Sequence, residues 1–159
     1  MNMENRKKAA LYCRAANASD FGIETHEKLL RQYASEHGYD NISVYADNGY
    51  SGLKYDRPAF MQMDSDIQAG LIDTVIAKDI ARISRSYLYF GKWIDCMCGR
   101  NVRVIVVNER LDSDSYNTVN ASFTEAIEKY YKETHSQRTK AGIAHARQRR
   151  LEQAAKLAE

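Results

Sequence analysis

The chain has 159 residues, a formal net charge of +2 and three cysteines, which fits one ordinary domain with its own core. Cys96 and Cys98 have no histidine or further cysteine nearby, so neither a disulfide framework nor a zinc site is expected. No apolar run is long enough for a membrane span or a signal leader. We therefore expect a soluble, cytoplasmic protein without a membrane partner.

Apolar segments along the chain predict four strands that alternate with three helices. The predicted strands are 9–13, 42–46, 74–77 and 102–107. The predicted helices are 23–37, 58–69 and one that contains Leu88 and ends near Arg100. This order predicts an α/β three-layer sandwich, in which helices cover both faces of a four- or five-stranded, mostly parallel sheet.

The last predicted element is a single long helix, which divides the chain into a body, 1–120, and a helical segment, 121–159. Ser122 and Glu125 form a capping-box pattern, and only Gly142 interrupts the helical sequence after it. The first half carries an apolar stripe, so we expect it to pack on the body or on another subunit. The second half is basic, and we expect it to project from the body.

Charged and polar residues follow three of the predicted strands at the point where each strand ends. Arg14 follows the first strand, 47–52 follows the second and 78–85 follows the third. Ligands bind outside the carboxyl ends of the strands in open parallel sheets. We therefore expect these segments, together with Arg57, to converge on one crevice.

The expected crevice gathers four arginines: Arg14, Arg57, Arg82 and Arg85. Guanidinium groups bind anionic oxygens in pairs and stay charged, and only Asp47 and Asp79 lie near enough in the sequence to offset them. A phosphodiester is therefore the natural occupant. The chain contains no Walker-type Gly-Lys-Ser/Thr and no G-x-G-x-x-G, so no nucleotide cofactor is predicted.

Five segments carry a resemblance to a known family: Tyr12-Cys13-Arg14, 47–52 (DNGYSG), Arg57-Pro58, 78–85 (KDIARISR) and Gln137-Arg138. In this order they resemble the serine recombinase (resolvase/invertase) family, specifically the N-terminal catalytic domain of its large, transposon-type members. The resemblance implies a resolvase-like fold and site-specific DNA recombination and integration. It also implies metal-free cleavage through a phosphoserine, without a cofactor, by a dimer or tetramer.

The resemblance also implies roles for individual residues. The arginines that stabilise the pentacoordinate phosphate are Arg14, Arg57, Arg82, Arg85 and Arg138, and Tyr12 and Asp47 lie in the matching motifs of the same site. The DNA-binding residues are Lys78, Lys140, Arg147, Arg149 and Arg150, of which those after Gln137 are expected to contact phosphates without reading sequence.

Three positions depart from the family pattern, and one of them is the nucleophile. The family motif Tyr-x-Arg-Val-Ser-Thr has its nucleophilic serine where this chain has Ala16, which has no oxygen to attack phosphorus. Ala81 replaces an Asp or Ser, and His26 replaces a glutamine. Ser19 is displaced from the nucleophile position by several ångströms, whereas catalysis poorly tolerates a misplacement of about 1 Å. We therefore expect a domain that cannot cleave DNA by itself.

Two other interpretations remain open from the sequence. One is a non-catalytic regulator that retains DNA contacts and dimerisation and pairs with an active recombinase, as a homo- or hetero-oligomer. The other is a flavodoxin-like or receiver-like domain on the same kind of sheet. The arginines argue against the latter, because receiver sites collect carboxylates around a divalent ion.

Overall fold

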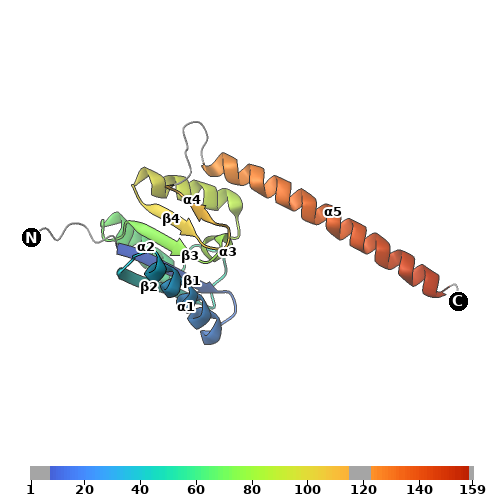
Figure 1. The fold of residues 1–159 in the computed structure, drawn as a ribbon, viewed down its shortest axis with the longest axis horizontal. Coiled ribbons are helices and arrows are strands. Elements are labelled where there is room, and N and C mark those ends of the chain that lie inside the picture. Colours follow the sequence, from blue (N-terminus) through green and yellow to red (C-terminus); the bar gives the residue numbers. More distant parts are fainter. Residues whose placement is uncertain (1–7, 115–122, 158–159) are drawn as a thin grey trace, which may run out of the picture.

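A computed structural model describes residues 8–114 and 123–157 as one five-stranded sheet with helices on both faces and a projecting helix (Figure 1). The strands are β1 (Lys8–Ala15), β2 (Asn41–Asn48), β3 (Thr74–Ala77), β4 (Arg103–Val106) and β5 (Leu111–Asp112). The helices are α1 (Asp20–Glu36), α2 (Pro58–Gln68), α3 (Ile80–Ile83), α4 (Tyr87–Gly99) and α5 (Phe123–Leu157). The strand order is β2-β1-β3-β4-β5, and only the β4–β5 pair is antiparallel.

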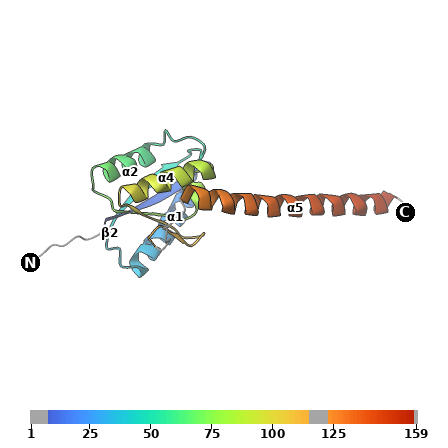
Figure 2. The ribbon, with the colours of Figure 1, turned by 90° about the horizontal axis from the view of Figure 1, so that it is seen from above.

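The side chains of β1 alternate between two apolar cores, one on each face of the sheet. Ala10 and Tyr12 pack with α2 and α4, whereas Leu11 and Cys13 pack with α1 on the opposite face (Figure 2). Because successive residues of a strand point to opposite faces, nearly every position of a strand covered on both sides is buried. The predicted three-layer α/β sandwich is therefore confirmed.

The structure adds β5 and α3 to the predicted elements and extends others. β5 has only two residues, too few to show a periodicity in the sequence, and the ion pair from Arg103 to Asp112 secures it against β4. The helix expected from Ile23 begins at Asp20, because the Ser19 hydroxyl caps it by accepting from the Gly22 amide at 3.2 Å.

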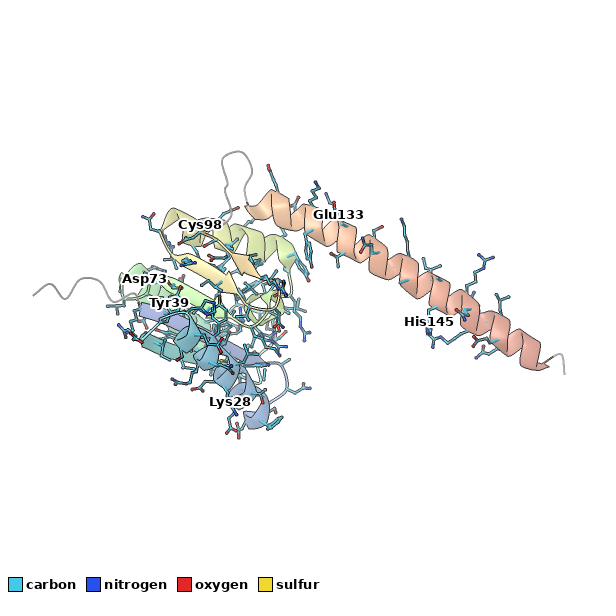
Figure 3. All side chains as sticks on the ribbon, viewed as in Figure 1. Lys28, Tyr39, Asp73, Cys98, Glu133 and His145 are labelled. Atoms are coloured by element: carbon cyan, nitrogen blue, oxygen red, sulfur yellow. The ribbon has the colours of Figure 1, made fainter. Side chains whose placement is uncertain are left out.

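The long helix is present as α5, with 35 residues, which is about 52 Å at about 1.5 Å per residue. Its first half packs against α4 and the rest extends away from the body (Figures 1 and 2). Residues 139–153 are exposed throughout, and the side chains of Glu133 and His145 stand clear of the sheet in Figure 3. The predicted cap Ser122 lies outside the described residues. Within those residues, no helix is long and apolar enough to cross a membrane.

Candidate functional site

The carboxyl ends of β1 and β3 and the loops beyond β2 bring four arginines together. This arginine cluster consists of Arg14, Arg57, Arg82 and Arg85. Arg14 lies beside Asp47 in the β1–β2 register, and Tyr12 lies beside Ala77 at the end of β3. The parallel strand order therefore places these residues at one edge of the sheet, where ligands of open parallel sheets bind.

Arg14 is buried, and each of its three guanidinium nitrogens donates a hydrogen bond to a backbone carbonyl. Its Nε donates to the Arg82 carbonyl at 3.0 Å, Nη1 to that of Tyr50 at 2.8 Å and Nη2 to that of Ala81 at 2.6 Å. Only 1% of the residue is exposed. Burial, followed by the positive charge of Arg57, lowers the pKa of Arg14 from its usual value. Arg14 thus joins β1 to α3 and to the loop after β2.

Arg57 is also buried, with no exposed surface, and like Arg14 it contacts the backbone of α3. Its Nη1 donates to the Tyr12 hydroxyl at 2.8 Å and to the Arg82 carbonyl at 3.0 Å, and its Nη2 donates to the Ile83 carbonyl at 2.5 Å. The guanidinium carbon lies 4.3 Å from the centre of the Phe60 ring, a cation–π contact. Arg57 Nε is buried and has no hydrogen-bond partner among the described residues.

Tyr12 and Asp47 form a buried pair beneath the arginines. The Tyr12 hydroxyl donates to Asp47 Oδ2 at 2.8 Å. The Asp47 carboxylate also accepts from the Ala59 and Phe60 amides at 2.9 and 3.0 Å, so it caps α2, whose N-cap residue Arg57 has no capping side chain. Burial raises the pKa of Tyr12, and the hydrogen bond to Asp47 raises it further. Both predicted site residues therefore lie in the framework of the site.

Arg82 and Arg85 lie at the accessible side of the cluster. Arg82 Nη1 donates to the Arg14 carbonyl at 3.0 Å, and its Nε lies 3.2 Å from an Asp79 carboxylate oxygen. The Arg82 side chain is 26% exposed and Arg85 is exposed. Within the described residues, the Arg85 guanidinium has no hydrogen-bond or ion-pair partner. The cluster thus presents unneutralised positive charge to solvent.

Ala16 and Ala81, two of the positions that depart from the family pattern, are exposed beside these arginines. The amides of Gly49 and Tyr50 donate to the Ala15 carbonyl at 2.8 and 3.1 Å, so the loop after β2 meets the chain just before Ala16. Neither alanine supplies a nucleophile or a proton donor. The Ser19 hydroxyl caps α1 by accepting from the Gly22 amide at 3.2 Å.

His26, the third departing position, is buried on α1 with 8% of its surface exposed, and its Nδ1 has no hydrogen-bond partner. Burial lowers the pKa of His26, and the nearby charges of Arg82 and Lys78 lower it further, while Asp79 opposes them. The imidazole is therefore held neutral beside the arginine cluster.

Of the remaining predicted residues, those whose side chains the structure describes lie outside the cluster. Lys78 is half-buried at the end of β3, and its carbonyl accepts from the Asn108 amide at 2.9 Å. The side chain of Arg138 lies outside the described residues. The cations of the second half of α5 are exposed along the projecting helix: Lys140, Arg147, Arg149 and Arg150.

Sequence reasoning missed the contacts that hold α3. Glu109 accepts from the Ile80 amide at 3.3 Å, and the carbonyls of Tyr50, Ala81, Arg82 and Ile83 accept from the buried arginines. Every residue has a backbone carbonyl, so no pattern of side chains in the sequence predicts which carbonyls accept these hydrogen bonds. Among the described residues, no group of three or more His, Cys, Asp or Glu side chains is placed to hold a metal ion.

Comparison with known proteins defines the class. The sequence pattern of the family described as "Resolvase, N terminal domain" matches residues 9–150. The chain therefore belongs to this family, whose structural relatives include serine recombinase catalytic domains, and the family inferred from the motifs is confirmed.

Individual relatives place the chain more closely. It is similar to a putative DNA recombinase of Bacillus subtilis strain 168, with 30% identity over 105 residues, which span 66% of this chain and 21% of that protein. A resolvase of Clostridium perfringens is 28% identical over 134 residues, 80% of this chain and 69% of that protein. The N-terminal catalytic domain of TP901-1 integrase superposes with a TM-score of 0.66 and 30% identity, over 81% of this chain and 99% of that one.

Proposed function

We propose that this chain is a serine recombinase catalytic domain that holds a DNA phosphodiester at the arginine cluster and does not cleave it by itself. The observation that carries the proposal is Ala16, an exposed residue directly after β1, beside an otherwise intact cluster of arginines. Family membership supports DNA as the substrate and site-specific recombination as the process.

The proposed role of the arginines is electrostatic. In phosphoryl transfer, positive groups stabilise the charge that develops on the equatorial oxygens of phosphorus. Arg14, Arg57, Arg82 and Arg85 supply that field here, and Arg138 is proposed to join them from α5. The covalent step requires an oxygen nucleophile, which an alanine methyl group cannot provide. We therefore assign binding without cleavage to this site.

The test is covalent trapping on a suicide DNA substrate that carries a nick beside the cleavage position. The unmodified chain should give no covalent adduct on denaturing gels. Ala16→Ser should recover at most a trace, because residues that act as a unit are not additive and the loss of a nucleophile costs about six orders of magnitude. Ala16→Ser with Ala81→Asp should give more adduct than Ala16→Ser alone.

An adduct formed by the unmodified chain and mapped to Ser19 would contradict the proposal. Full cleavage by Ala16→Ser alone would show that Ala81 and His26 do not impair catalysis. Both results are read from the same gel, with peptide mapping of the attached residue.

A second candidate function is that of a non-catalytic partner of an active recombinase, in a homo- or hetero-oligomer. The observation that favours it is α5, whose exposed basic second half remains available for DNA and for another subunit. Mixing the chain with an active family member should then produce mixed oligomers on DNA and a dose-dependent change in recombination. Unchanged recombination at a large molar excess would eliminate this role.

A further inference from the structure

The single turn α3 lies between two sets of opposite charges. At its N-terminal end, the Arg82 amide donates to Asp79 Oδ1 at 3.1 Å and the Ile80 amide donates to Glu109. At its C-terminal end, Arg14 and Arg57 donate to three successive carbonyls, those of Ala81, Arg82 and Ile83. Carboxylates at the amide end and cations at the carbonyl end satisfy the groups that every helix leaves unpaired.

We propose that Arg14 and Arg57 are positioning residues that hold α3, and that the anion is contacted by Arg82 and Arg85, which α3 and the residues after it carry. This inference rests on the proposed phosphodiester site, because it divides the work among its four arginines. All four residues are arginines, but Arg14 and Arg57 donate to protein carbonyls, whereas Arg82 and Arg85 lie on the accessible side of the cluster.

Exposure separates the two groups. Arg14 is 1% exposed and Arg57 is 0% exposed, so in this conformation neither offers appreciable surface to a phosphate arriving from solvent. The Arg82 side chain is 26% exposed, and Arg85 is exposed with no side-chain partner in the described part of the chain. The unpaired Arg57 Nε is buried, so an incoming anion meets the guanidinium groups of Arg82 and Arg85 first.

Gly52 closes the remaining approach to Arg14. A Cβ atom at this position would lie 2.8 Å from Arg14 Nη2 and 3.1 Å from its Cζ, so the backbone of residue 52 covers the guanidinium directly. The Gly52 carbonyl also accepts from the Arg85 amide at 3.1 Å. The same residue thus covers Arg14 and fixes the backbone from which Arg85 extends.

An arginine performs this positioning task where a lysine cannot. The planar guanidinium offers five donors in a fixed fork, whereas an ammonium is a compact point charge on a flexible stem. Arg57 joins the Tyr12 hydroxyl and the carbonyls of Arg82 and Ile83 through two nitrogens. Substitution by lysine keeps the charge and removes this geometry, which makes Arg→Lys the informative change.

The primary experiment is an NMR titration of the unmodified chain with inorganic phosphate, following the Nε–H signals of the four arginines. We expect the Arg82 and Arg85 signals to shift along one binding isotherm, while those of Arg14 and Arg57 stay in place. Shifts of the Arg14 or Arg57 signals along that same isotherm would overturn the division of roles and leave the phosphate site intact. No shift in any of the four would instead refute the proposed function, and this inference with it.

Two matched variants separate positioning from contact through hydrogen exchange of the amides of residues 80–86. Arg57→Lys should weaken phosphate binding roughly 10- to 100-fold, the range for one charged hydrogen bond, and should accelerate this exchange. Arg85→Lys should weaken binding and leave the exchange unchanged. Weaker binding in Arg57→Lys with unchanged exchange would contradict a positioning role. If Arg57→Lys does not fold, the titration of the unmodified chain decides the question by itself.

Discussion

The arginine cluster and the second half of α5 are both basic, yet they use their cations in opposite ways. Arg14 and Arg57 are almost completely shielded from water and donate to protein carbonyls, whereas Arg147 and Arg150 are exposed on a helix that projects from the body. A buried guanidinium needs hydrogen-bond acceptors within the protein, because burying a charge without partners costs free energy. Exposure leaves it free to meet a phosphate. The same residue type is thus buried against protein acceptors in one region and exposed to solvent in the other.

The largest effect on stability is expected from removing a buried guanidinium. Arg57→Met should lower the free energy of unfolding by about 2–5 kcal/mol, because it removes the donor to the buried Ile83 carbonyl and one of the two donors to the Arg82 carbonyl. Urea denaturation followed by circular dichroism measures the loss. Arg147→Met on α5 is the control and should stay within about 0.5 kcal/mol of the unmodified chain. An equal loss of unfolding free energy in Arg57→Met and Arg147→Met would contradict the difference proposed between the two regions.

A smaller loss is expected from filling the space above Arg14. The Cβ introduced by Gly52→Ala would meet Arg14 Nη2 at 2.8 Å and Arg85 Cγ at 2.9 Å, and overpacking of this kind costs about 1–3 kcal/mol. Gly99→Ala is the control, because its added Cβ would meet no described atom within 4 Å apart from its own chain neighbours and the adjacent helix backbone. Thermal unfolding of both variants should show a loss for Gly52→Ala and none for Gly99→Ala. A neutral Gly52→Ala would show that Arg85 moves aside freely.

The neutral His26 should make stability depend on pH. Because its folded pKa is lowered, the unfolded chain binds more protons between that value and about 6.5, so stability falls as the pH drops through this window. His26→Gln should flatten the dependence, by less than the ceiling of about 1.4 kcal/mol per pH unit for one proton. Urea midpoints measured at about pH 7.5 and at about pH 5.5, which lie above and below the ordinary histidine pKa of about 6.5, give the size of the effect. His145→Gln on exposed α5 should leave the unmodified profile intact.

The smallest effect on stability, and the clearest effect on DNA, is expected from the exposed cations of α5. Arg147→Ala combined with Arg150→Ala should leave unfolding within about 0.5 kcal/mol per change and weaken DNA binding on every sequence alike. The slope of log affinity against log salt should fall by about 0.9 for each phosphate that the variant no longer neutralises. Fluorescence anisotropy over a salt series gives both quantities. An unchanged slope would mean that the second half of α5 is a solvated helix that does not touch DNA.

Local patterns in the amino-acid sequence were enough to establish the order of the elements and the class of the fold. Apolar runs bounded by turn residues located four strands, Pro58 marked the start of α2, and the helical pattern after Ser122, interrupted only by Gly142, marked α5. These features can be read locally, because hydrophobic periodicity and turn chemistry depend on neighbouring residues. The motif order was sufficient to identify the family, and the alanine at position 16 was visible without coordinates.

The partners of each arginine in the cluster, in contrast, follow from the three-dimensional fold alone. Arg14 and Arg82 are 68 positions apart, yet each donates to the carbonyl of the other, and Asp47 caps a helix that starts beyond Arg57. Acceptors of this kind are backbone groups, which carry no sequence signature, and their encounter depends on strand order and loop packing. The sequence therefore predicted a shared site for four arginines, whereas burial and hydrogen bonding in the fold separate the two that hold α3 from the two that face solvent.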